Sequence, residues 1–317
     1  MRYLITGGAG FIGSNIAIEL VRRGEDVTVL DIFSTGREEN LSSIRDEIAV
    51  IRGDIRDYET VTSAVRGVDH VIHQAAIASV ESSIEDPVGS SEVNINGTLK
   101  LLEACKREGV KRFVMASSAA VYGNIPSLPK TEDSEVQALS PYAAAKLTGE
   151  HYCNIYHDLF GLETVALRYF NVFGRNQDPA SEYAAVIPKF INALLLGKPP
   201  VIYGDGLQTR DFVFVDNVVS ANLLAVESKD AAGKVINIAS GRKYTLLDLV
   251  AALWELMGVD IEPIFEKEKP GDIRHSVADI SKATKLLGYD ILTDFKEGLR
   301  HTIEYFKTMV PRQVRAR

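Results

Sequence analysis

Short apolar runs alternate with longer amphipathic stretches through the first half of the chain. The apolar runs that have the length of buried strands are residues 2–6, 27–30, 48–52, 68–73, 112–116 and 164–167. Apolar residues at helical spacing fill the stretches 11–23, 87–107 and 141–160. Strands that alternate with helices predict an α/β fold, a doubly wound parallel sheet with helices on both faces.

Glycines and polar residues stand where the predicted strands end. Those nearest the strand ends are Gly7, Asp31, Asp54, His73 and Ser118. Ligands of such sheets bind beyond the carboxyl ends of the strands. The sequence therefore predicts a ligand site along this one edge.

The first strand is followed by Gly7-x-x-Gly10-x-x-Gly13 and then by a helical pattern. Glycines in such a turn let the backbone approach a pyrophosphate, and the helix N-terminus attracts the phosphates. Asp31, roughly 20 residues further on, can accept hydrogen bonds from an adenosine ribose. A carboxylate there repels a 2′-phosphate, so the pattern favours NAD over NADP, although Arg37 is nearby. The alternative is a glycine-rich turn that binds nothing.

A tyrosine and a lysine occur four residues apart in the stretch that begins Ser140-Pro141. Ser140 can cap a helix and Pro141 suits its first position, which places Tyr142 and Lys146 on one helix face. A phenol beside an ammonium is a candidate acid/base pair. The alternative is an ordinary exposed helix face.

From about residue 170 the regular alternation loosens and shorter elements appear. We expect an NAD-binding Rossmann domain over residues 1–169, with returns near 205–261, and a smaller α/β substrate domain over residues 170–317. Because no linker rich in Pro and Gly separates them, the two domains are expected to interleave.

Composition excludes several classes of protein. The 317 residues are 46% apolar and 25% charged, as in globular proteins, and the net charge of −8 argues against a nucleic-acid partner. The two cysteines suggest no disulfide framework, and no apolar run is long enough for a membrane span, so we expect a cytoplasmic protein. No metal is expected, since His70 and His73 would point to opposite faces of a strand.

Several motifs together resemble the extended short-chain dehydrogenase/reductase superfamily. These motifs are Thr6-Gly7-x-x-Gly10-x-x-Gly13, Asn94-x-x-Gly97-Thr98, Ser117-Ser118-Ala119-Ala120-Val121-Tyr122-Gly123 and Tyr142-x-x-x-Lys146. Two further motifs narrow the resemblance to UDP-hexose 4-epimerases, namely the segments from Arg168 to Gly174 and from Arg210 to Phe212. The segments 175–179 and 183–188 are most similar to the branch that acts on UDP-N-acetylglucosamine.

The resemblance implies a mechanism for Tyr142, Lys146 and Ser118. NAD⁺ would accept a hydride from C4 of the sugar while Tyr142 takes the O4 proton, and the hydride would return to the other face of the 4-keto sugar. Lys146 and the positive nicotinamide ring both favour the phenolate. Ser118 would bridge the proton between O4 and Tyr142, although a serine at a strand end can also simply cap a turn.

The resemblance also implies the residues that bind the cofactor. Besides Tyr142 and Lys146 they are Gly7, Gly10, Phe11, Ile12, Gly13, Asp31, Asp54, Ile55, Ala75, Ala76, Asn94, Tyr169 and Phe170. Tyr169 and Phe170 are expected to wall the nicotinamide. Ile32 and Ala78 depart from the family pattern, which places an asparagine and, in some members, a lysine at these positions.

The same resemblance implies the residues that bind a UDP-sugar. Besides Ser118 and Tyr142 they are Ser79, Asn171, Val186, Tyr203, Arg210, Asp272 and Ser276. Ser79 could also belong to a polar loop, and Arg210 could form a surface ion pair with Asp211. Ser276 stands where epimerases restricted to glucose carry a tyrosine, so we expect a pocket that accepts both plain and N-acetylated UDP-hexoses.

Related activities remain as alternatives. Ala119 and Ala120 replace the acidic residues that a 4,6-dehydratase or a UDP-glucuronate decarboxylase would require. A UDP-glucuronate 4-epimerase stays open, and so does an NAD-sensing regulator without catalysis. The resemblance further implies a homodimer formed through the helices at 87–107 and 141–160, whose apolar stripes could instead face the sheet.

Overall fold

The computed structural model describes residues 1–178, 185–268 and 273–309. Its largest element is one parallel sheet with the strand order β11-β6-β5-β4-β1-β2-β3. The strands are β1 (Arg2–Thr6), β2 (Asp26–Asp31), β3 (Ile48–Arg52), β4 (His70–His73), β5 (Arg112–Ser118), β6 (Glu163–Tyr169) and β11 (Lys234–Ile238). The predicted α/β doubly wound fold is thereby confirmed, and the strand order reverses between β1 and β4.

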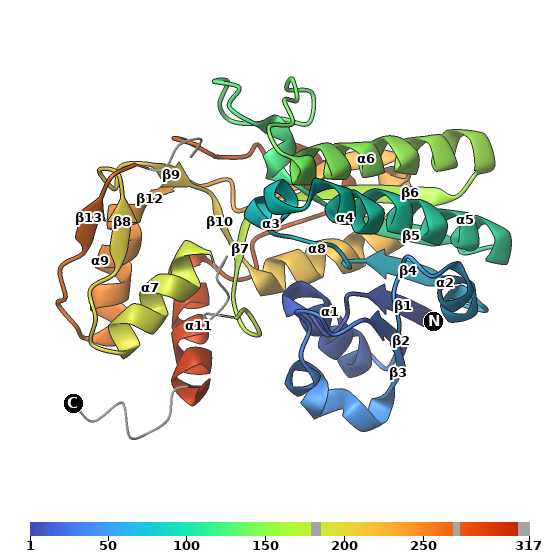
Figure 1. Cartoon of the computed structure of the whole chain (residues 1–317), viewed down its shortest axis with the longest axis horizontal. Helices are drawn as coiled ribbons and strands as arrows, with labels where there is room; N and C mark the ends of the chain where they lie inside the picture. Colours follow the sequence, from blue (N-terminus) through green and yellow to red (C-terminus); the bar gives the residue numbers. More distant parts are fainter. Residues whose placement is uncertain (179–184, 269–272, 310–317) are drawn as a thin grey trace.

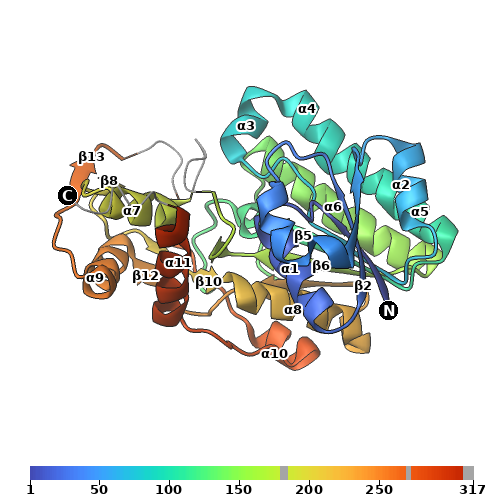
Figure 2. The same ribbon diagram turned by 90° about the horizontal axis from the view of Figure 1, so that it is seen from below.

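Helices cover both faces of this sheet (Figures 1 and 2). One face carries α2 (Tyr58–Val65), α5 (Thr98–Glu108) and α6 (Pro141–Phe160), and the other carries α1 (Phe11–Arg22) and α8 (Val215–Glu227). Alternate side chains of β1 enter two separate cores. Leu4 packs on the α5 side, whereas Tyr3 and Ile5 pack on the α1 side.

The segment predicted as one helix over residues 87–107 is divided in the structure. It consists of α4 (Pro87–Ser91), a π-helical turn η2 (Glu92–Gly97) and α5. Within η2, the Asn94 side chain accepts a hydrogen bond from Ile77 N (2.8 Å) and donates one to Ile77 O (3.0 Å). The π-helical turn therefore contains the side chain, Asn94, that fixes the loop after β4 at Ile77.

Helix α6 begins as its sequence predicts. Ser140 is the N-cap and accepts a hydrogen bond from Ala143 N (3.1 Å), and Pro141 occupies the first turn. Gly161, in the left-handed conformation, ends the helix. Shorter helical segments are η1 (Glu38–Glu47), α3 (Val80–Glu85), η3 (Ala119–Tyr122), η4 (Lys229–Ala231) and α10 (Ser281–Leu287).

A smaller part of the molecule lies beside the sheet (Figure 1). It contains the strand pairs β7 (Asn171–Phe173) with β10 (Phe212–Phe214), β8 (Val201–Tyr203) with β13 (Ile264–Glu266) and β9 (Thr209–Arg210) with β12 (Tyr244–Thr245). Its helices are α7 (Val186–Leu195), α9 (Leu246–Met257) and α11 (Phe295–Met309). Strand β11 is part of the large sheet and helix α8 packs on it, so both belong to the larger part although they come after residue 205. The division near residue 170 itself stays a prediction.

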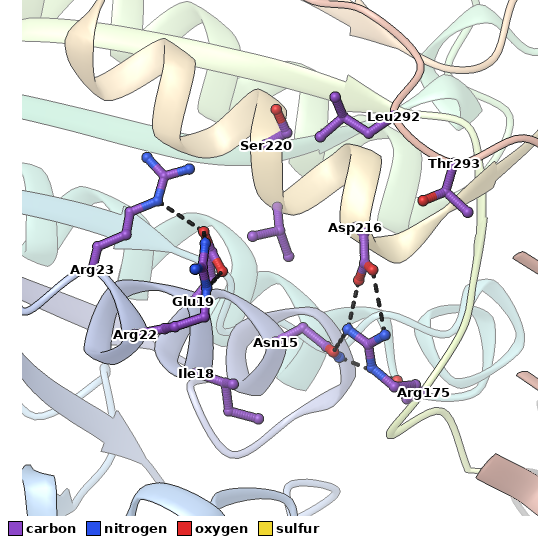
Figure 3. Close-up of a pocket in the computed structure, with 11 residues that line it drawn as sticks. Asn15, Ile18, Glu19, Arg22, Arg23, Arg175, Asp216, Ser220, Leu292 and Thr293 are labelled. Carbon is purple, nitrogen blue, oxygen red and sulfur yellow. Dashed lines mark hydrogen bonds and ion pairs between the residues drawn. The ribbon is translucent and has the colours of Figure 1, made fainter. Parts of the chain in front are cut away.

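The turn after β7 is fastened to helix α1 (Figure 3). Asn15 donates a hydrogen bond to Arg175 O (3.1 Å), and the Arg175 guanidinium pairs with Asp216 on α8 (2.6 Å). The next residue, Asn176, has φ +63 and donates to Ser14 Oγ (2.9 Å). These contacts fix the start of the smaller part against the helix that follows the glycine loop.

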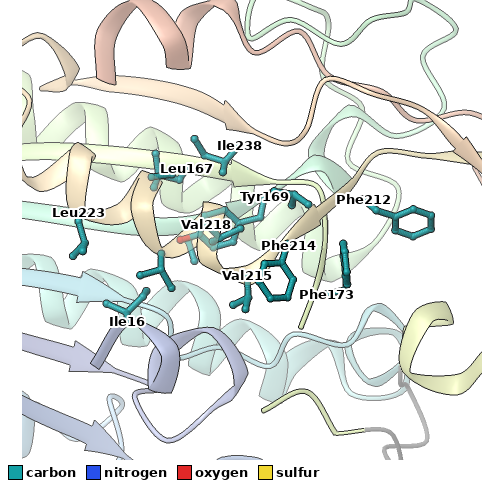
Figure 4. Close-up of a cluster of buried hydrophobic side chains, with 14 of the residues drawn as sticks. Ile16, Leu167, Tyr169, Phe173, Phe212, Phe214, Val215, Val218, Leu223 and Ile238 are labelled. Carbon is teal, nitrogen blue, oxygen red and sulfur yellow. The ribbon is translucent and has the colours of Figure 1, made fainter. Parts of the chain in front are cut away.

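One apolar core runs from the sheet into the smaller part (Figure 4). Its members at the junction include Tyr169, Phe173, Phe212, Phe214, Val215 and Val218. Burial of this continuous surface stabilises the arrangement of the two parts. None of the helices in the described ranges is long and apolar enough to cross a membrane.

Candidate active site

A cavity of about 660 Å³ opens at the carboxyl ends of the strands. The predicted cofactor-binding residues that line it are Gly7, Gly10, Phe11, Ile12, Gly13, Asp31, Asp54, Ile55, Ala75 and Ala76. They come from the ends of β1, β2, β3 and β4, which are adjacent in the sheet. The expected ligand edge and the observed cavity therefore coincide.

The glycine loop brings backbone unusually close to backbone. Gly7 has φ +67, and a Cβ atom on it would lie 2.6 Å from Ala75 N. A Cβ atom on Gly13 would lie 2.2 Å from Gly7 O. Only glycine satisfies these contacts, and α1 then starts directly at the cavity with its N–H groups free for a pyrophosphate. This cradle fits a dinucleotide.

Asp31 is held at the ribose end of the cavity. Its carboxylate accepts hydrogen bonds from Ala9 N (2.9 Å) and Phe33 N (2.7 Å). A carboxylate oxygen can accept a second hydrogen bond, so ribose hydroxyls can still bind it. Arg37 is paired with Asp178 and does not line the cavity. The ribose end thus presents a negative charge and suits NAD rather than NADP.

Other lining residues are missing from the sequence prediction. They include Ser34, Thr35 and Gly36 after β2, Arg56 after β3, and Gln74 after β4. Their signal is position alone, because each follows a strand end at the same edge. The departing residues Ile32 and Ala78 line the cavity as well.

Besides Tyr142 and Lys146, three predicted cofactor residues do not line the cavity. Asn94 holds Ile77, as described above. Tyr169 is buried and donates a hydrogen bond from its hydroxyl to Asn222 Oδ1 (2.9 Å). Phe170 is buried against the Tyr122 ring. The side chains of Tyr169 and Phe170 therefore pack in the core, and their contact with a nicotinamide stays a prediction.

Tyr142, Lys146 and Ser118 come together beside the cavity. Lys146 Nζ donates to Ala116 O on β5 (2.8 Å) and lies 5.7 Å from the centre of the Tyr142 ring. The Ser118 hydroxyl, at the end of β5, lies close enough to the Tyr142 phenol to lower its pKa. The backbone N–H of Tyr142 donates to the buried Ser83 Oγ (3.1 Å), which fixes the start of α6.

Burial acts on the pKa of both partners. It raises the pKa of the Tyr142 phenol, and the neighbouring Ser118 hydroxyl opposes that rise. Burial also lowers the pKa of Lys146 to about 8, and the carboxylate of Glu150 opposes that fall. A partly buried phenol beside a buried ammonium suits controlled proton transfer.

The predicted substrate residues divide into two groups. Asn171, Arg210 and Ser276 gather around one backbone segment, because Asn171 donates to Asp211 O (3.1 Å) and Ser276 N donates to Thr209 O (3.1 Å). The others are Val186 at the start of α7, Tyr203 at the end of β8 and Ser79, which is the N-cap of α3. Asp272 lies outside the described residues.

Asp211 does not form the surface ion pair that was the alternative for Arg210. Its carboxylate is fully buried and accepts hydrogen bonds from Ser240 N (2.8 Å), Gly241 N (3.0 Å) and Ala278 N (3.2 Å). It therefore ties the strand that carries Arg210 to the segment that carries Ser276.

A second cavity, of about 290 Å³, lies between α1 and α8 and contains none of the predicted site residues (Figure 3). Its charged groups are paired with one another, Arg175 with Asp216 and Arg22 with Glu19. Across the described ranges, no group of three or more His, Cys, Asp or Glu side chains is placed to hold a metal ion.

Comparison with known proteins provides an independent observation. A family model described as "NAD dependent epimerase/dehydratase family" matches residues 3–239. The UDP-glucose 4-epimerase of Mycolicibacterium smegmatis is 39% identical over 97% of this chain and 99% of its own length. The structure of the UDP-N-acetylglucosamine 4-epimerase from Methanobrevibacter ruminantium M1, in complex with UDP-N-acetylmuramic acid, matches with a TM-score of 0.94 and 41% identity, over 98% of this chain and 99% of that one. The UDP-glucuronic acid 4-epimerase from Bacillus cereus, with UDP-glucuronic acid and NAD bound, matches with a TM-score of 0.90 and 35% identity, over 98% and 100%.

Proposed function

Because the chain belongs to the NAD-dependent epimerase/dehydratase family, and within it to the UDP-sugar 4-epimerases, we propose that it inverts C4 of UDP-hexoses with or without a 2-N-acetyl group. The small side chain of Ser276, whose backbone N–H donates to Thr209 O, supports the proposal that both kinds of UDP-hexose are accepted. Bound NAD supplies the hydride acceptor and donor.

Tyr142, Ser118 and Lys146 are proposed as the catalytic residues. Tyr142 takes the proton from O4 and returns it, and Ser118, next to the phenol, bridges that proton between O4 and Tyr142. Burial raises the pKa of the phenol, so ionisation near neutral pH requires added positive charge. Lys146, held by the Ala116 carbonyl, supplies part of that charge, and the oxidised nicotinamide supplies the rest.

The segment of Ser276 is held on both sides. Ser276 N donates to Thr209 O (3.1 Å), and Lys130 N donates to Val277 O (2.8 Å). A side chain at position 276 thus projects from a fixed backbone, and its volume sets the space beside it. A serine there leaves room that a tyrosine would fill.

The proposed function is tested by product analysis. The protein is incubated separately with UDP-glucose, UDP-N-acetylglucosamine and UDP-glucuronate, and the products are resolved by chromatography. Epimerisation of the first two supports the proposal. Turnover of UDP-glucuronate alone would instead establish the alternative epimerase, and NAD binding without any turnover would point to a regulator.

Ser276→Tyr is expected to lower kcat/KM for UDP-N-acetylglucosamine roughly tenfold relative to UDP-glucose, because the phenol occupies the space of the N-acetyl group. The ratio of the two kcat/KM values is the measurement, and Ser276→Thr is the matched control. An unchanged ratio in Ser276→Tyr would refute the role of this position.

We also propose a homodimer, formed through α6 and the α3–α4 region. Leu159 and Val88 are each 72% exposed, and Ile155 and Ile84 are exposed as well. They lie at opposite ends of one helical surface, since α3 and α4 pack against the start of α6. A two-fold axis across this surface would place Leu159 and Ile155 of one copy against Val88 and Ile84 of the second copy.

Leu159→Glu is expected to shift this dimer towards monomer, because a carboxylate would be buried in the interface. Light scattering at micromolar protein concentration measures the mass. Leu292→Glu, at a residue 69% exposed in the smaller part, is the control and should leave the mass unchanged. A dimer that persists in Leu159→Glu would exclude this surface.

A further inference from the structure

Behind the proposed catalytic residues lies a buried ion pair that the mechanism above does not use. Glu150 is 2% exposed and Arg168 is 4% exposed. Arg168 Nε donates to Glu150 Oε1 (2.9 Å), and Arg168 Nη2 donates to Glu150 Oε2 (2.8 Å). The pair is therefore bidentate, which fixes both the distance and the orientation of its partners.

The ion pair joins the helix of Tyr142 to two strands of the sheet. Glu150 lies on α6, Arg168 on β6, and Ser117 on β5 donates a third hydrogen bond to Glu150 Oε1. Ser117 and Arg168 are partners in the β5–β6 register. The guanidinium also lies 4.8 Å from the centre of the Tyr122 ring. Three elements thus meet at one carboxylate, and η3 packs on the guanidinium.

This carboxylate shares a helix face with the catalytic pair. Tyr142, Lys146 and Glu150 follow one another at intervals of four residues along α6. On β5, Ser117 donates to Glu150, and the adjacent Ser118 faces the Tyr142 phenol and lowers its pKa. A displacement of Glu150 would therefore move both hydroxyls of the proposed proton path.

We propose that Glu150 is a positioning residue for the epimerase reaction: with Arg168 and Ser117 it holds α6 in register with β5, and it keeps a negative charge one turn from Lys146. The proposal rests on the proposed function, since it assigns Glu150 to the same site. The structural role, which is to hold α6 against β5, and the electrostatic role, which is to keep a negative charge near Lys146, lead to separate expected results.

The electrostatic half concerns the charge of Lys146. The groups that face its ammonium are Tyr142 and Glu150 on α6, the buried His73 on β4 and, through Glu150, Arg168 on β6. Burial lowers the pKa of Lys146 to about 8, and Glu150 is the group that opposes this fall. Loss of the Glu150 charge should therefore neutralise Lys146 at lower pH.

Glu150→Gln removes the charge and keeps the shape. We expect the alkaline fall of kcat to move about one pH unit lower, so that turnover drops about tenfold at pH 8 and little at pH 6. The ¹³Cε resonance of Lys146, assigned with Lys146→Arg, should titrate lower by the same interval. A loss of turnover that is equal at every pH, or an unchanged Lys146 titration, would overturn the electrostatic role.

Glu150→Gln leaves Arg168 buried without its counter-charge, so the variant could be unstable. The double variant Glu150→Gln/Arg168→Met removes both charges. Its melting temperature should return towards the wild-type value, while its kcat should still fall at the lower pH seen in Glu150→Gln. A melting temperature that stays low, or a fall of kcat that returns to its original pH, would contradict the proposal.

Glu163→Gln is the matched control. Glu163 pairs with the buried Arg112 (2.7 Å) between the same two strands, at their far ends. This variant should leave both the pH profile and the Lys146 titration unchanged. If the wild-type protein turns over none of the UDP-sugars, the proposed function fails, and the Lys146 titration still decides the role of Glu150.

Discussion

Tyr142→Phe is expected to lower kcat by about 10³-fold for every UDP-sugar that the protein converts. The substitution removes one oxygen, the atom proposed to exchange a proton with O4 of the sugar. The ring keeps its place, because Ser83 Oγ accepts the backbone N–H of residue 142 and Ser140 caps the helix. NAD binding and UDP-sugar binding, measured by calorimetry, should therefore stay within a few-fold of the original values.

The matched control is Tyr152→Phe, a half-buried tyrosine on the same helix and away from the strand ends. It should turn over substrate at the original rate. Turnover of Tyr142→Phe at a near-normal rate would show that another group moves the proton, and the assignment of Lys146 and Ser118 would lose its basis.

Gly13→Ala is expected to weaken NAD binding roughly 30-fold, through about 2 kcal/mol of overpacking. The new Cβ atom would lie 2.2 Å from Gly7 O and 2.8 Å from Gly8 Cα, and both are backbone atoms of the loop itself. The loop or the start of α1 must move, and the N–H groups that face the pyrophosphate move with it. NAD affinity of the purified apo-protein is the measurement.

Gly10→Ala separates this steric effect from a general cost of alanine in the loop. Its Cβ atom would meet only Gly7 O, at 3.2 Å, so a shift of a few tenths of an ångström relieves it. We expect its NAD affinity to fall only a few-fold. Equal losses in the two variants, or a lower melting temperature in Gly13→Ala with unchanged NAD affinity, would argue against the close approach at Gly13.

The features predicted from sequence are those with a local signal. The alternation of strands and helices fixes the fold class, and the rule for parallel sheets then places Gly7, Asp31 and Asp54 at one edge. Both the fold and the NAD cofactor are confirmed. The start of α6 is predictable because Ser140 and Pro141 act within one helical turn.

The features that escaped prediction depend on contacts between distant segments. The π-helical turn at residues 92–97 accompanies the bonds of Asn94 to Ile77, which periodicity cannot reveal. The Tyr169 hydroxyl is bound to Asn222, a residue far along the chain that no local pattern indicates, while its contact with the nicotinamide stays a prediction. The surface ion pair that was the alternative for Arg210 does not form, because Asp211 is buried and its partners lie in two later loops.

The interleaving of the two parts has a consequence for how the chain folds. Strand β6 gains its outer neighbour, β11, only when residues 234–238 have been made, and α8 covers β5 and β6 only after residue 215. Until then a growing chain carries an unpaired strand edge and an uncovered apolar face, the two features that favour aggregation. Contacts of such long sequence separation also slow folding. The nucleotide-binding sheet thus cannot be completed on the ribosome until residues 170–238, which include the first elements of the smaller part, have been made. Substitutions between residues 170 and 238 can therefore reduce the yield of folded protein without contacting the site.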